Sequence, residues 1–513
     1  MNKIVVYRTH IEINNYFLGD NPQLEKAFSV YDSLYHKLFP KGIYYDRDRR
    51  ILMLPRSTSI FNLERDFGCQ AVVDFSCDPI RYFDNPIQLK YTPRDQDQIT
   101  AIQFMLGKGN FWHNKDKTMI ALNLNTGKGK SYCAIATIGY LNMATAIITD
   151  TIGCLDQWMG YFLEYTNLTK EDIFYVSGTM SINKLYRMDI NRYKVFLIPH
   201  ATLQSYGNNH GWNKVSKLFK YLGIGIKIFD EAHLDFDNMT MIDFYTNTNI
   251  TYYLTATLGR SDFNENRIFQ TYFNGVPSID LFNQDEDPHT AYVGIKYNSC
   301  PTPMDIQDCN TAYGMSTVKY ADYVVDQPAF HNMLHILVQK ALAKPGKCLW
   351  YIGTNNAILK VRDWIYANYP ELIRQVGIYT SVTPKEHKQE QLERKIILST
   401  TKSAGAAMDI KGLVETVNLA EPFKSRVLAQ QSFGRTRDPN TIYKDLVDLG
   451  FQQTKAYYNH KKPVFNKYAT SCREVIMKPA EVQKRADEIV EKRKDLHCPI
   501  IFEDDRKPVS KND

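Results

Sequence analysis

The chain has 513 residues, of which 44% are hydrophobic and 23% are charged, with a formal net charge of +6 at pH 7. This length is too great for one ordinary core and predicts a globular protein of roughly two to four domains. Because no apolar run approaches the roughly 20 residues that cross a bilayer, we expect no membrane partner. The nine cysteines form no Cys-x-x-Cys pair, which favours reduced thiols in a cytoplasmic location over a zinc ribbon or a disulfide framework.

Residues 1–90 are expected to form a small α+β domain that binds nucleic acid or has an accessory role. Residues 3–8 and 51–54 have the composition of strands, whereas the apolar spacing over residues 24–38 predicts a helix that ends at Pro40. The turn before the second strand is basic and aromatic, and its arginines are Arg47, Arg49 and Arg50. We expect these arginines to contact nucleic acid, with an ordinary solvated surface as the equal alternative.

Strands and amphipathic helices alternate over residues 91–260, which is the pattern of a parallel sheet with helices on both faces. The apolar runs expected to be strands lie at residues 118–123, 144–149, 194–198, 224–229 and 250–254. The stretch 261–330 loses this alternation and is rich in Asn, Asp and Pro. We therefore interpret it as an insertion or linker.

Alternation resumes over residues 331–452, which we expect to form a second α/β lobe. Its strands are expected near residues 347–352, 375–379, 395–399, 414–419 and 442–448. Lysines and tyrosines are interleaved in residues 453–513, which we interpret as a basic C-terminal extension. It is expected to contain a helix over residues 479–494 and a disordered tail of roughly a dozen residues.

A glycine- and lysine-rich run follows the first strand of the α/β region. It consists of Thr126, Gly127, Lys128, Gly129, Lys130 and Ser131. The glycines let backbone N–H groups point at phosphate oxygens, and the next helix adds the positive end of its dipole. We expect Lys130 to reach the β- and γ-phosphates of ATP and Ser131 to bind Mg²⁺. Leu124 replaces the first glycine of the strict motif, so a surface turn is the alternative.

Two adjacent carboxylates, Asp230 and Glu231, follow the apolar strand 224–229 in the sequence Asp-Glu-Ala-His, which ends at His233. Ligands bind at the carboxyl ends of strands in open α/β sheets. We expect Asp230 to hold Mg²⁺ and Glu231 to orient and deprotonate the attacking water. Alone, such a pair is more often part of a solvated loop. Its distance of about 100 residues from a phosphate loop instead favours the partner carboxylates of an ATP site.

Gln431 and Arg435 belong to a third element, in the second lobe. An arginine brought to the γ-phosphate stabilises transition-state charge, an effect of about 10³–10⁵ in rate. A helix-face arginine in a salt bridge is the alternative for Arg435 taken by itself. Together with the two preceding elements, the arginine finger is favoured.

In their order, these elements resemble the superfamily 2 helicases of the DEAD/DEAH-box class, over residues 91–450. The resemblance implies an α/β fold of two tandem RecA-like parallel-sheet lobes, with ATP and Mg²⁺ as cofactors. It also implies that Gln98 contacts adenine. The residues that it assigns to coupling between ATP state and lobe movement are Thr255, Ala256 and Thr257.

Three further segments are similar to motifs of this class. Residues 147–158 resemble the first strand-contacting motif, although Asp150 replaces the usual proline. Residues 348–354 resemble the opening strand of the second lobe, and residues 397–410 resemble the next motif, with Ala407 where glycine is usual. The candidate phosphate contacts are Thr202, Thr354 and Thr400. Because Ser and Thr after strands commonly cap the next helix, capping is an equal alternative for each.

Within the class, residues 421–435 and the leader domain resemble UvsW-type phage helicases and related restriction-enzyme-like motors. This implies an ATP-dependent DNA helicase or translocase that acts on branched or duplex DNA in recombination, repair or replication. Recombination or replication proteins would be its partners, in the host cytoplasm if the chain is phage-encoded. Asp438 replaces a second arginine of the family, and Arg437 lies one residue early.

Three other functions stay open from the sequence. An RNA-directed helicase shares the Asp-Glu-Ala-His sequence, and a restriction complex could use the chain as its motor subunit. A nucleotide-dependent DNA-binding scaffold is suggested by the altered positions Leu124, Ala407 and Asp438. Retention of Lys130, Glu231 and Arg435 argues against that scaffold.

Overall fold

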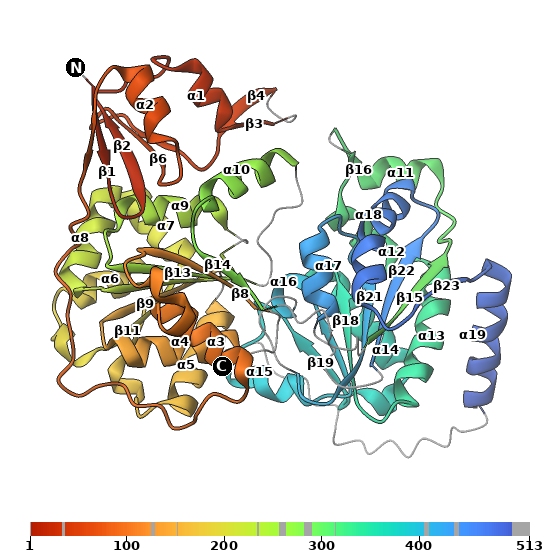
Figure 1. Ribbon diagram of the computed structural model, residues 1–513. Coiled ribbons are helices and arrows are strands. Elements are labelled where there is room, and N and C mark those ends of the chain that lie inside the picture. Colours follow the sequence, from red (N-terminus) through yellow and green to blue (C-terminus); the bar gives the residue numbers. More distant parts are fainter. Residues whose placement is uncertain are drawn as a thin grey trace. The chain divides into compact units, whose positions relative to one another are not determined.

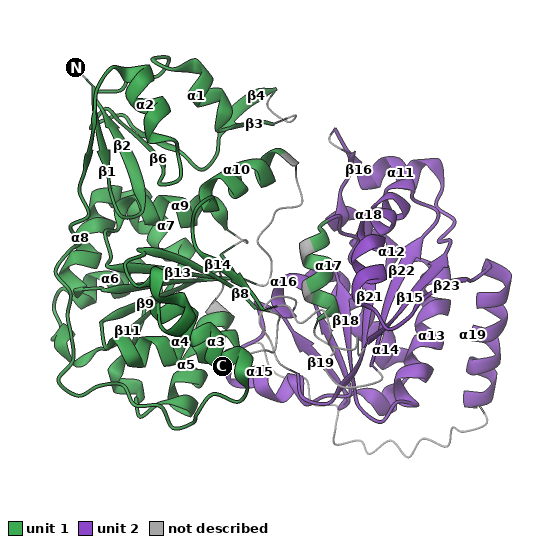
Figure 2. Cartoon of the chain, viewed as in Figure 1, with its two compact units in different colours: residues 1–287, 425–434 green, residues 288–424, 435–513 purple. Residues whose placement is uncertain are grey.

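The computed structural model describes residues 2–32, 36–124, 129–150, 152–232, 235–255, 263–281, 290–312, 314–404, 410–434 and 441–494. Contacts divide the chain into two compact units (Figure 2). The first unit contains residues 1–287 and 425–434, and the second contains residues 288–424 and 435–513. Among the helices described, none combines the length and hydropathy needed to cross a membrane.

The first unit is built on a seven-stranded sheet with the order β10-β11-β9-β12-β13-β8-β14, in which all neighbours are parallel. Its strands are β8 (Met119–Asn123), β9 (Thr145–Thr149), β10 (Ile173–Tyr175), β11 (Val195–Pro199), β12 (Ile226–Asp230), β13 (Ile250–Thr255) and β14 (Ser278–Asp280). The five strands expected over residues 91–260 are confirmed. The short edge strands β10 and β14 were not expected, because three residues leave little periodicity to detect.

Helices cover both faces of this sheet (Figure 1). They are α3 (Gln96–Leu106), α4 (Lys130–Leu141), α5 (Ile152–Tyr165), α6 (Thr179–Leu185), α7 (His200–His210), α8 (Trp212–Leu222), α9 (Phe236–Tyr245), α10 (Phe263–Phe273) and the short η1 (Gly109–Asn114), η2 (Lys170–Asp172) and η3 (Ile190–Arg192). Alternate residues of β8 enter opposite cores: Ile120 packs in the core of α3, α4 and α5, and Ala121 in that of α7, α8 and α9. Because helices cover both faces of the sheet, the central strands are buried on both sides and consist mostly of apolar residues.

The leader is a five-stranded sheet with the order β5-β6-β2-β1-β7. Its elements are β1 (Lys3–Val6), β2 (His10–Asn14), α1 (Pro22–Ala27), β3 (Ser29–Asp32), β4 (Lys37–Pro40), β5 (Tyr44–Asp46), β6 (Ile51–Pro55), α2 (Ile60–Phe67) and β7 (Ala71–Val73). The helix expected over residues 24–38 is wrong beyond Ala27. Strands β3 and β4 pair there as an antiparallel hairpin, with Val30 opposite Phe39, because β-branched and aromatic residues favour strand pairing.

The leader packs directly on the first lobe within the first unit. The Thr9 hydroxyl donates to the Asp243 carbonyl at 2.9 Å, and the Tyr245 hydroxyl donates to the Asp46 carboxylate at 2.9 Å. Met53 of β6 belongs to the same hydrophobic core as α7, α8 and α9. Burial of both polar contacts and apolar surface makes the leader a fixed part of this unit.

The second unit also has a seven-stranded parallel sheet, with the order β19-β20-β18-β21-β22-β15-β23. Its strands are β15 (Thr290–Tyr297), β18 (Lys347–Ile352), β19 (Val376–Tyr379), β20 (Ile396–Ser399), β21 (Leu413–Ala420), β22 (Thr441–Asp448) and β23 (Cys472–Ile476), beside the small pair β16 (Asn310–Thr311) and β17 (Gly314–Met315). Its helices are α11 (Pro303–Cys309), α12 (Thr317–Val324), α13 (Pro328–Leu342), α14 (Asn355–Asn368), η4 (Pro370–Leu372), α15 (Lys385–Leu392), α16 (Thr401–Ala404), α18 (Gln452–Tyr468) and α19 (Pro479–Lys494). Helix α17 (Arg426–Phe433) is grouped with the first unit.

The two sheets have the same strand order when each is numbered from its own first strand. Strand β15 therefore occupies the place that β8 has in the first sheet. This corrects the interpretation of residues 261–330 as an insertion or linker, because they supply α10 and β14 to the first unit and β15, α11 and α12 to the second. Residues 453–494 are likewise not an appendage, since β23 pairs with β15. The tail expected to be disordered lies outside the described residues.

Candidate active site

The phosphate-loop residues that the structure describes lie between β8 and the first turn of α4. Gly129 has φ of +85° and precedes Lys130, the first residue of the helix. The positive φ disfavours any other residue at this position, and the Gln98 amide nitrogen lies 2.2 Å from where a Cβ atom would stand. The Gln98 Oε1 accepts the Arg94 backbone N–H at 2.8 Å. Three residues of the predicted loop, Thr126, Gly127 and Lys128, lie outside the described part of the chain.

Strand β12 brings Asp230 and Glu231 to the same end of the sheet as Lys130. The Lys130 Nζ lies 2.6 Å from Glu231 Oε1 and 3.5 Å from Asp230 Oδ1. All three side chains are at most 12% exposed. Asp230 and Glu231 thus contact the Lys130 ammonium although they lie about 100 residues away in sequence. This was expected, because the carboxyl ends of parallel strands meet at one edge of a sheet. His233 lies outside the described residues.

Burial and neighbouring charges have opposite effects on the pKa values of Lys130 and Asp230. Burial by itself disfavours the Lys130 ammonium, but the Glu231 and Asp230 carboxylates outweigh it and raise the pKa of Lys130. Burial also raises the pKa of Asp230, against the opposing effect of Lys130. The lysine is therefore held as a cation, and its charge offsets part of the cost of burying the Asp230 carboxylate.

The backbone around the carboxylates is tied to the neighbouring strands. Glu231 has φ of +52°, a left-handed conformation that costs a non-glycine residue roughly 1 kcal/mol or more. The Ala232 N–H donates to the Leu254 carbonyl at 3.0 Å, and the Leu124 N–H donates to the Thr255 carbonyl at 3.1 Å. Thr255, the first residue of the predicted coupling element, is thus bonded to the start of the phosphate loop. The other two, Ala256 and Thr257, lie outside the described residues.

Asp230 has one partner that the sequence analysis did not identify. The Trp158 indole N–H, on α5, donates to Asp230 Oδ2 at 2.8 Å. The sequence placed Trp158 in a segment that resembles a strand-contacting motif, but nothing in that pattern indicates a bond to a residue 72 positions away. A buried indole needs a hydrogen-bond acceptor, and this requirement was the available signal.

The donor set fits a nucleotide with Mg²⁺. The Lys130 ammonium suits phosphate oxygens, and the Ser131 hydroxyl and the Asp230 carboxylate are the hard oxygen ligands that Mg²⁺ prefers. In the described part of the chain, no group of three or more His, Cys, Asp or Glu side chains could hold a metal by itself.

The threonines predicted to contact nucleic acid act as helix caps or lie in the interior. The Thr354 Oγ1 accepts the Ala357 N–H at 2.9 Å, and the Thr400 Oγ1 accepts the Ser403 N–H at 3.0 Å. Thr202 is buried within α7. The capping alternative is therefore the geometry observed for Thr354 and Thr400, although a capping hydroxyl can still face a ligand.

The predicted arginines have different surroundings. Arg49 lies 3.6 Å from Glu12 and 3.9 Å from Asp46, so its charge is compensated. Arg50 lies over the Phe17 ring at 5.1 Å, and Arg47 is exposed. Arg435 lies outside the described residues, and Gln431 lies on α17 with its side chain outside the description.

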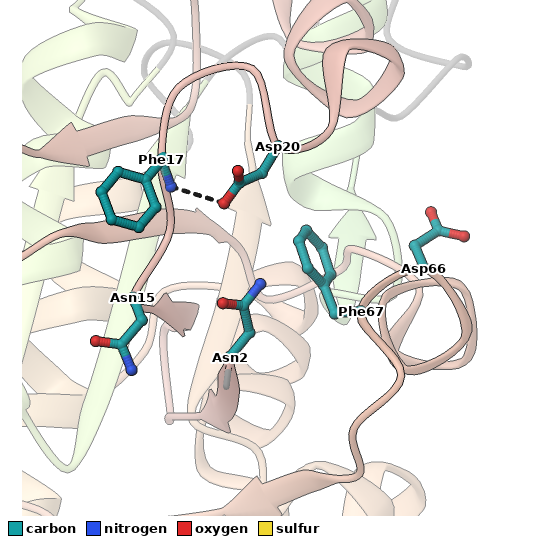
Figure 3. Close-up of a pocket in the computed structure, with 6 residues that line it drawn as sticks. All are labelled: Asn2, Asn15, Phe17, Asp20, Asp66 and Phe67. Atoms are coloured by element: carbon teal, nitrogen blue, oxygen red, sulfur yellow. Dashed lines mark hydrogen bonds between the residues drawn. The ribbon is translucent and has the colours of Figure 1, made fainter.

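The leader also carries an open pocket, lined by Asn2, Asn15, Phe17, Asp20, Asp66 and Phe67 (Figure 3). Its rim is fixed in part by the Phe17 N–H, which donates to Asp20 Oδ2 at 2.8 Å. No residue of the Lys130 cluster lines this pocket. The pocket is therefore separate from the candidate nucleotide site.

One part of the chain matches a known protein family. Residues 90–260 match the family described as type III restriction enzyme, res subunit. No curated protein matches the whole chain closely enough to be counted as a relative. The matched segment begins at the end of the leader and contains both Lys130 and the Asp230–Glu231 pair.

Solved structures show the same fold. S. cerevisiae Dbp5 bound to RNA and ADP BeF3 is 12% identical, over 77% of this chain and 93% of that chain, with a TM-score of 0.50. Mss116p bound to ssRNA and AMP-PNP is 14% identical, over 78% and 82%, with a TM-score of 0.50. T4 UvsW is 14% identical, over 92% and 99%, with a TM-score of 0.35. The Dbp5 and Mss116p structures thus show the fold of this chain, two tandem RecA-like lobes, and residues 90–260 are similar to the type III restriction enzyme res-subunit family.

Proposed function

We propose that the chain is an ATP-driven DNA helicase or translocase that acts on branched or duplex DNA in recombination, repair or replication. The observation that carries the proposal is the buried cluster of Lys130, Asp230 and Glu231 at the carboxyl edge of the first sheet. A structural ion pair would not require a glycine with positive φ and a helix N-terminus beside the lysine, whereas phosphate binding does.

The cluster suggests how hydrolysis would be organised. Without a phosphate, Lys130 is neutralised by Glu231, the closer of the two carboxylates. A triphosphate would take over the ammonium, and Glu231 would then be free to orient a water molecule and accept its proton. Mg²⁺, held by Ser131 and Asp230, would neutralise phosphate charge. The backbone bond from Leu124 to Thr255 would carry the state of the loop to β13.

Other roles rest on the sequence resemblance. Gln98 would contact adenine, Ala256 and Thr257 would continue the coupling element from Thr255, and Arg435 would stabilise transition-state charge. The grip on phosphates would come from donors such as Thr354, Thr400 and the exposed Arg47.

Two alternatives have a specific observation behind them. The Dbp5 and Mss116p structures contain RNA, which favours an RNA-directed helicase. The match of residues 90–260 to a restriction-enzyme subunit favours DNA, and is compatible with a motor subunit of a restriction complex. We favour DNA because the family match concerns the sequence, whereas the RNA-bound structures are similar in fold.

ATP hydrolysis should be measured with forked, four-way, duplex and single-stranded DNA, and with RNA of the same sequences. We expect branched or duplex DNA to raise kcat by at least about tenfold, whereas RNA competes poorly. Lys130→Ala should abolish turnover with every substrate. Stimulation by RNA but not by DNA would establish the RNA alternative, and turnover that no nucleic acid stimulates would refute a motor of either kind.

A further inference from the structure

Trp158 lies in the middle of α5 and is 1% exposed. Its ring packs in the core that α5 shares with α3 and α4, and it lies 6.0 Å from the Phe162 ring between centroids. From this fixed position its indole N–H reaches Asp230 Oδ2 at 2.8 Å. The donor cannot move without either the ring leaving its packed position or the helix itself shifting.

The Asp230 carboxylate is bonded at both oxygens. Its Oδ2 accepts from Trp158, and its Oδ1 accepts the Glu231 backbone N–H at 3.1 Å while facing Lys130 at 3.5 Å. Two donors on opposite oxygens fix the rotation of the carboxylate plane, which one donor would leave adjustable. Trp158 therefore determines the direction in which Asp230 presents its remaining lone pairs.

Helix α5 connects the indole to a segment that the sequence resemblance predicts to contact nucleic acid. It begins directly after β9 and packs against α4, β9 and β11. Its first residues belong to the stretch 147–158, whose sequence resembles a strand-contacting motif. A contact at the start of the helix would displace the indole as one body with the backbone, because a helix of 14 residues transmits small shifts along its length.

We propose that Trp158 is a positioning residue for Asp230, and that it transmits occupancy of the nucleic-acid surface at α5 to the nucleotide site. The proposal rests on the proposed function, since it names the element by which nucleic acid regulates ATP hydrolysis. Nucleic acid bound at α5 orients the indole N–H, the N–H orients Asp230, and hydrolysis accelerates.

The kinetic test uses Trp158→Phe in the full chain, with Trp350→Phe as the matched control. Trp350 is also fully buried, and among the described residues its indole N–H has no hydrogen-bond partner. Both changes remove similar ring volume, but only the first removes a bond. We expect Trp158→Phe to lower the nucleic-acid-stimulated kcat about tenfold, with KM for ATP within about twofold. Trp350→Phe should leave both parameters unchanged.

A second measurement does not depend on turnover. The five tryptophans of the chain give five indole N–H signals in a ¹⁵N-resolved NMR spectrum of the wild-type protein. Asp230→Ala should move one of them, and that signal should be absent from Trp158→Phe. Addition of a stimulating DNA should move the same signal in the wild-type protein. This readout also stands if Trp158→Phe fails to fold, because Asp230→Ala and the wild-type titration identify the signal without it.

The outcomes separate the two proposals. Wild-type ATP hydrolysis that no nucleic acid stimulates would refute the proposed function. Stimulated wild-type hydrolysis together with an unchanged kcat in Trp158→Phe would overturn only the role of Trp158. A Trp158 signal that ignores DNA would overturn the transmission step in the same way.

Discussion

The two seven-stranded sheets share one strand order, but different residues follow the fifth strand of each, β12 in the first and β21 in the second. In the first sheet, β12 ends in Asp230 and Glu231, and the Lys130 ammonium lies 2.6 Å from Glu231. In the second sheet, β21 is followed by Glu421, which accepts the Thr401 backbone N–H at 2.7 Å and also the Thr401 hydroxyl. The carboxyl end of the corresponding strand thus carries a charged cluster in the first sheet and a helix cap in the second.

The first strands of the two sheets explain this difference. Strand β8 leads to Gly129 and Lys130 at the start of α4, which supply a positive helix end and a fixed cation. Its counterpart β15 leads to Asn298 and Ser299, and the Ser299 N–H donates to Asp448. A repeated fold therefore provides two carboxyl edges, and the residues after the first strand are what distinguish the candidate phosphate site from its counterpart.

The largest expected effect contrasts the two carboxylates directly. Glu231→Gln should lower the stimulated kcat by about 10²–10³, because it removes the base that accepts the proton of water. Glu421→Gln should lower kcat less than about threefold, since an amide oxygen can still accept from Thr401. ATP hydrolysis measured side by side checks both variants. Equal losses would mean that the second carboxylate takes part in the chemistry.

The buried ion pairs of the two sheets allow a contrast in stability. Lys227 and Asp243 are 2.6 Å apart and fully buried, and the Tyr253 and Tyr272 hydroxyls also donate to Asp243 at 2.6 Å. Asp243→Ala leaves the ammonium without compensation, and should destabilise the first unit by about 3–5 kcal/mol. Urea unfolding followed by limited proteolysis of each unit would measure the loss.

The variant of the second sheet to compare with Asp243→Ala is Lys444→Met. Lys444 lies 2.5 Å from Glu415, but Lys344 also lies 3.3 Å from the same carboxylate. The remaining lysine should limit the loss to roughly half of that for Asp243→Ala. If Lys444→Met proves the more damaging change, compensation by Lys344 is not effective.

A smaller effect is expected from pH, and it should distinguish the second unit. Burial raises the pKa of Glu421 to about 7, against the hydrogen bonds from Thr401 and the charge of Lys461. Because the folded chain holds this proton more tightly than the unfolded chain, stability is highest below the unfolded pKa of 4.5 and falls as pH rises through about 7. We expect a loss of roughly 1–2 kcal/mol across this window. The free energy of unfolding of Glu421→Gln should lack this pH dependence. A pH profile identical to that of the wild-type protein would show that Glu421 is not the group responsible.

The smallest effect is expected outside both sheets, in the turn of the leader. Arg47→Ala should weaken DNA binding a few-fold and reduce the salt dependence by about one phosphate contact. Arg49→Ala is the control, because Glu12 and Asp46 already compensate its charge. DNA affinity measured at several salt concentrations would test the pair. A larger loss for Arg49→Ala would place the phosphate contact at Arg49 instead.

The sequence by itself predicted which residues of the first lobe form the candidate site. Lys130, Asp230 and Glu231 were identified because a loop between strand and helix, and a strand ending in two acids, are local patterns with a physical meaning. The alternation of strands and helices likewise predicted two parallel-sheet lobes. In the leader, the same kind of reasoning misread residues 24–38, since the spacing of apolar residues suits a helix and a hairpin with a partly buried Val30 equally well.

Only the tertiary structure decided which distant residues are partners. Strand β15 was missed because it lies within a stretch rich in Asn, Asp and Pro, and its place beside β22 depends on pairing across some 150 residues. The bond from Trp158 to Asp230 links two elements 72 residues apart, and a single sequence carries no record of which acceptor a buried indole will meet. Local patterns reveal what each residue can do, whereas the packing of strands and helices determines which residues act together.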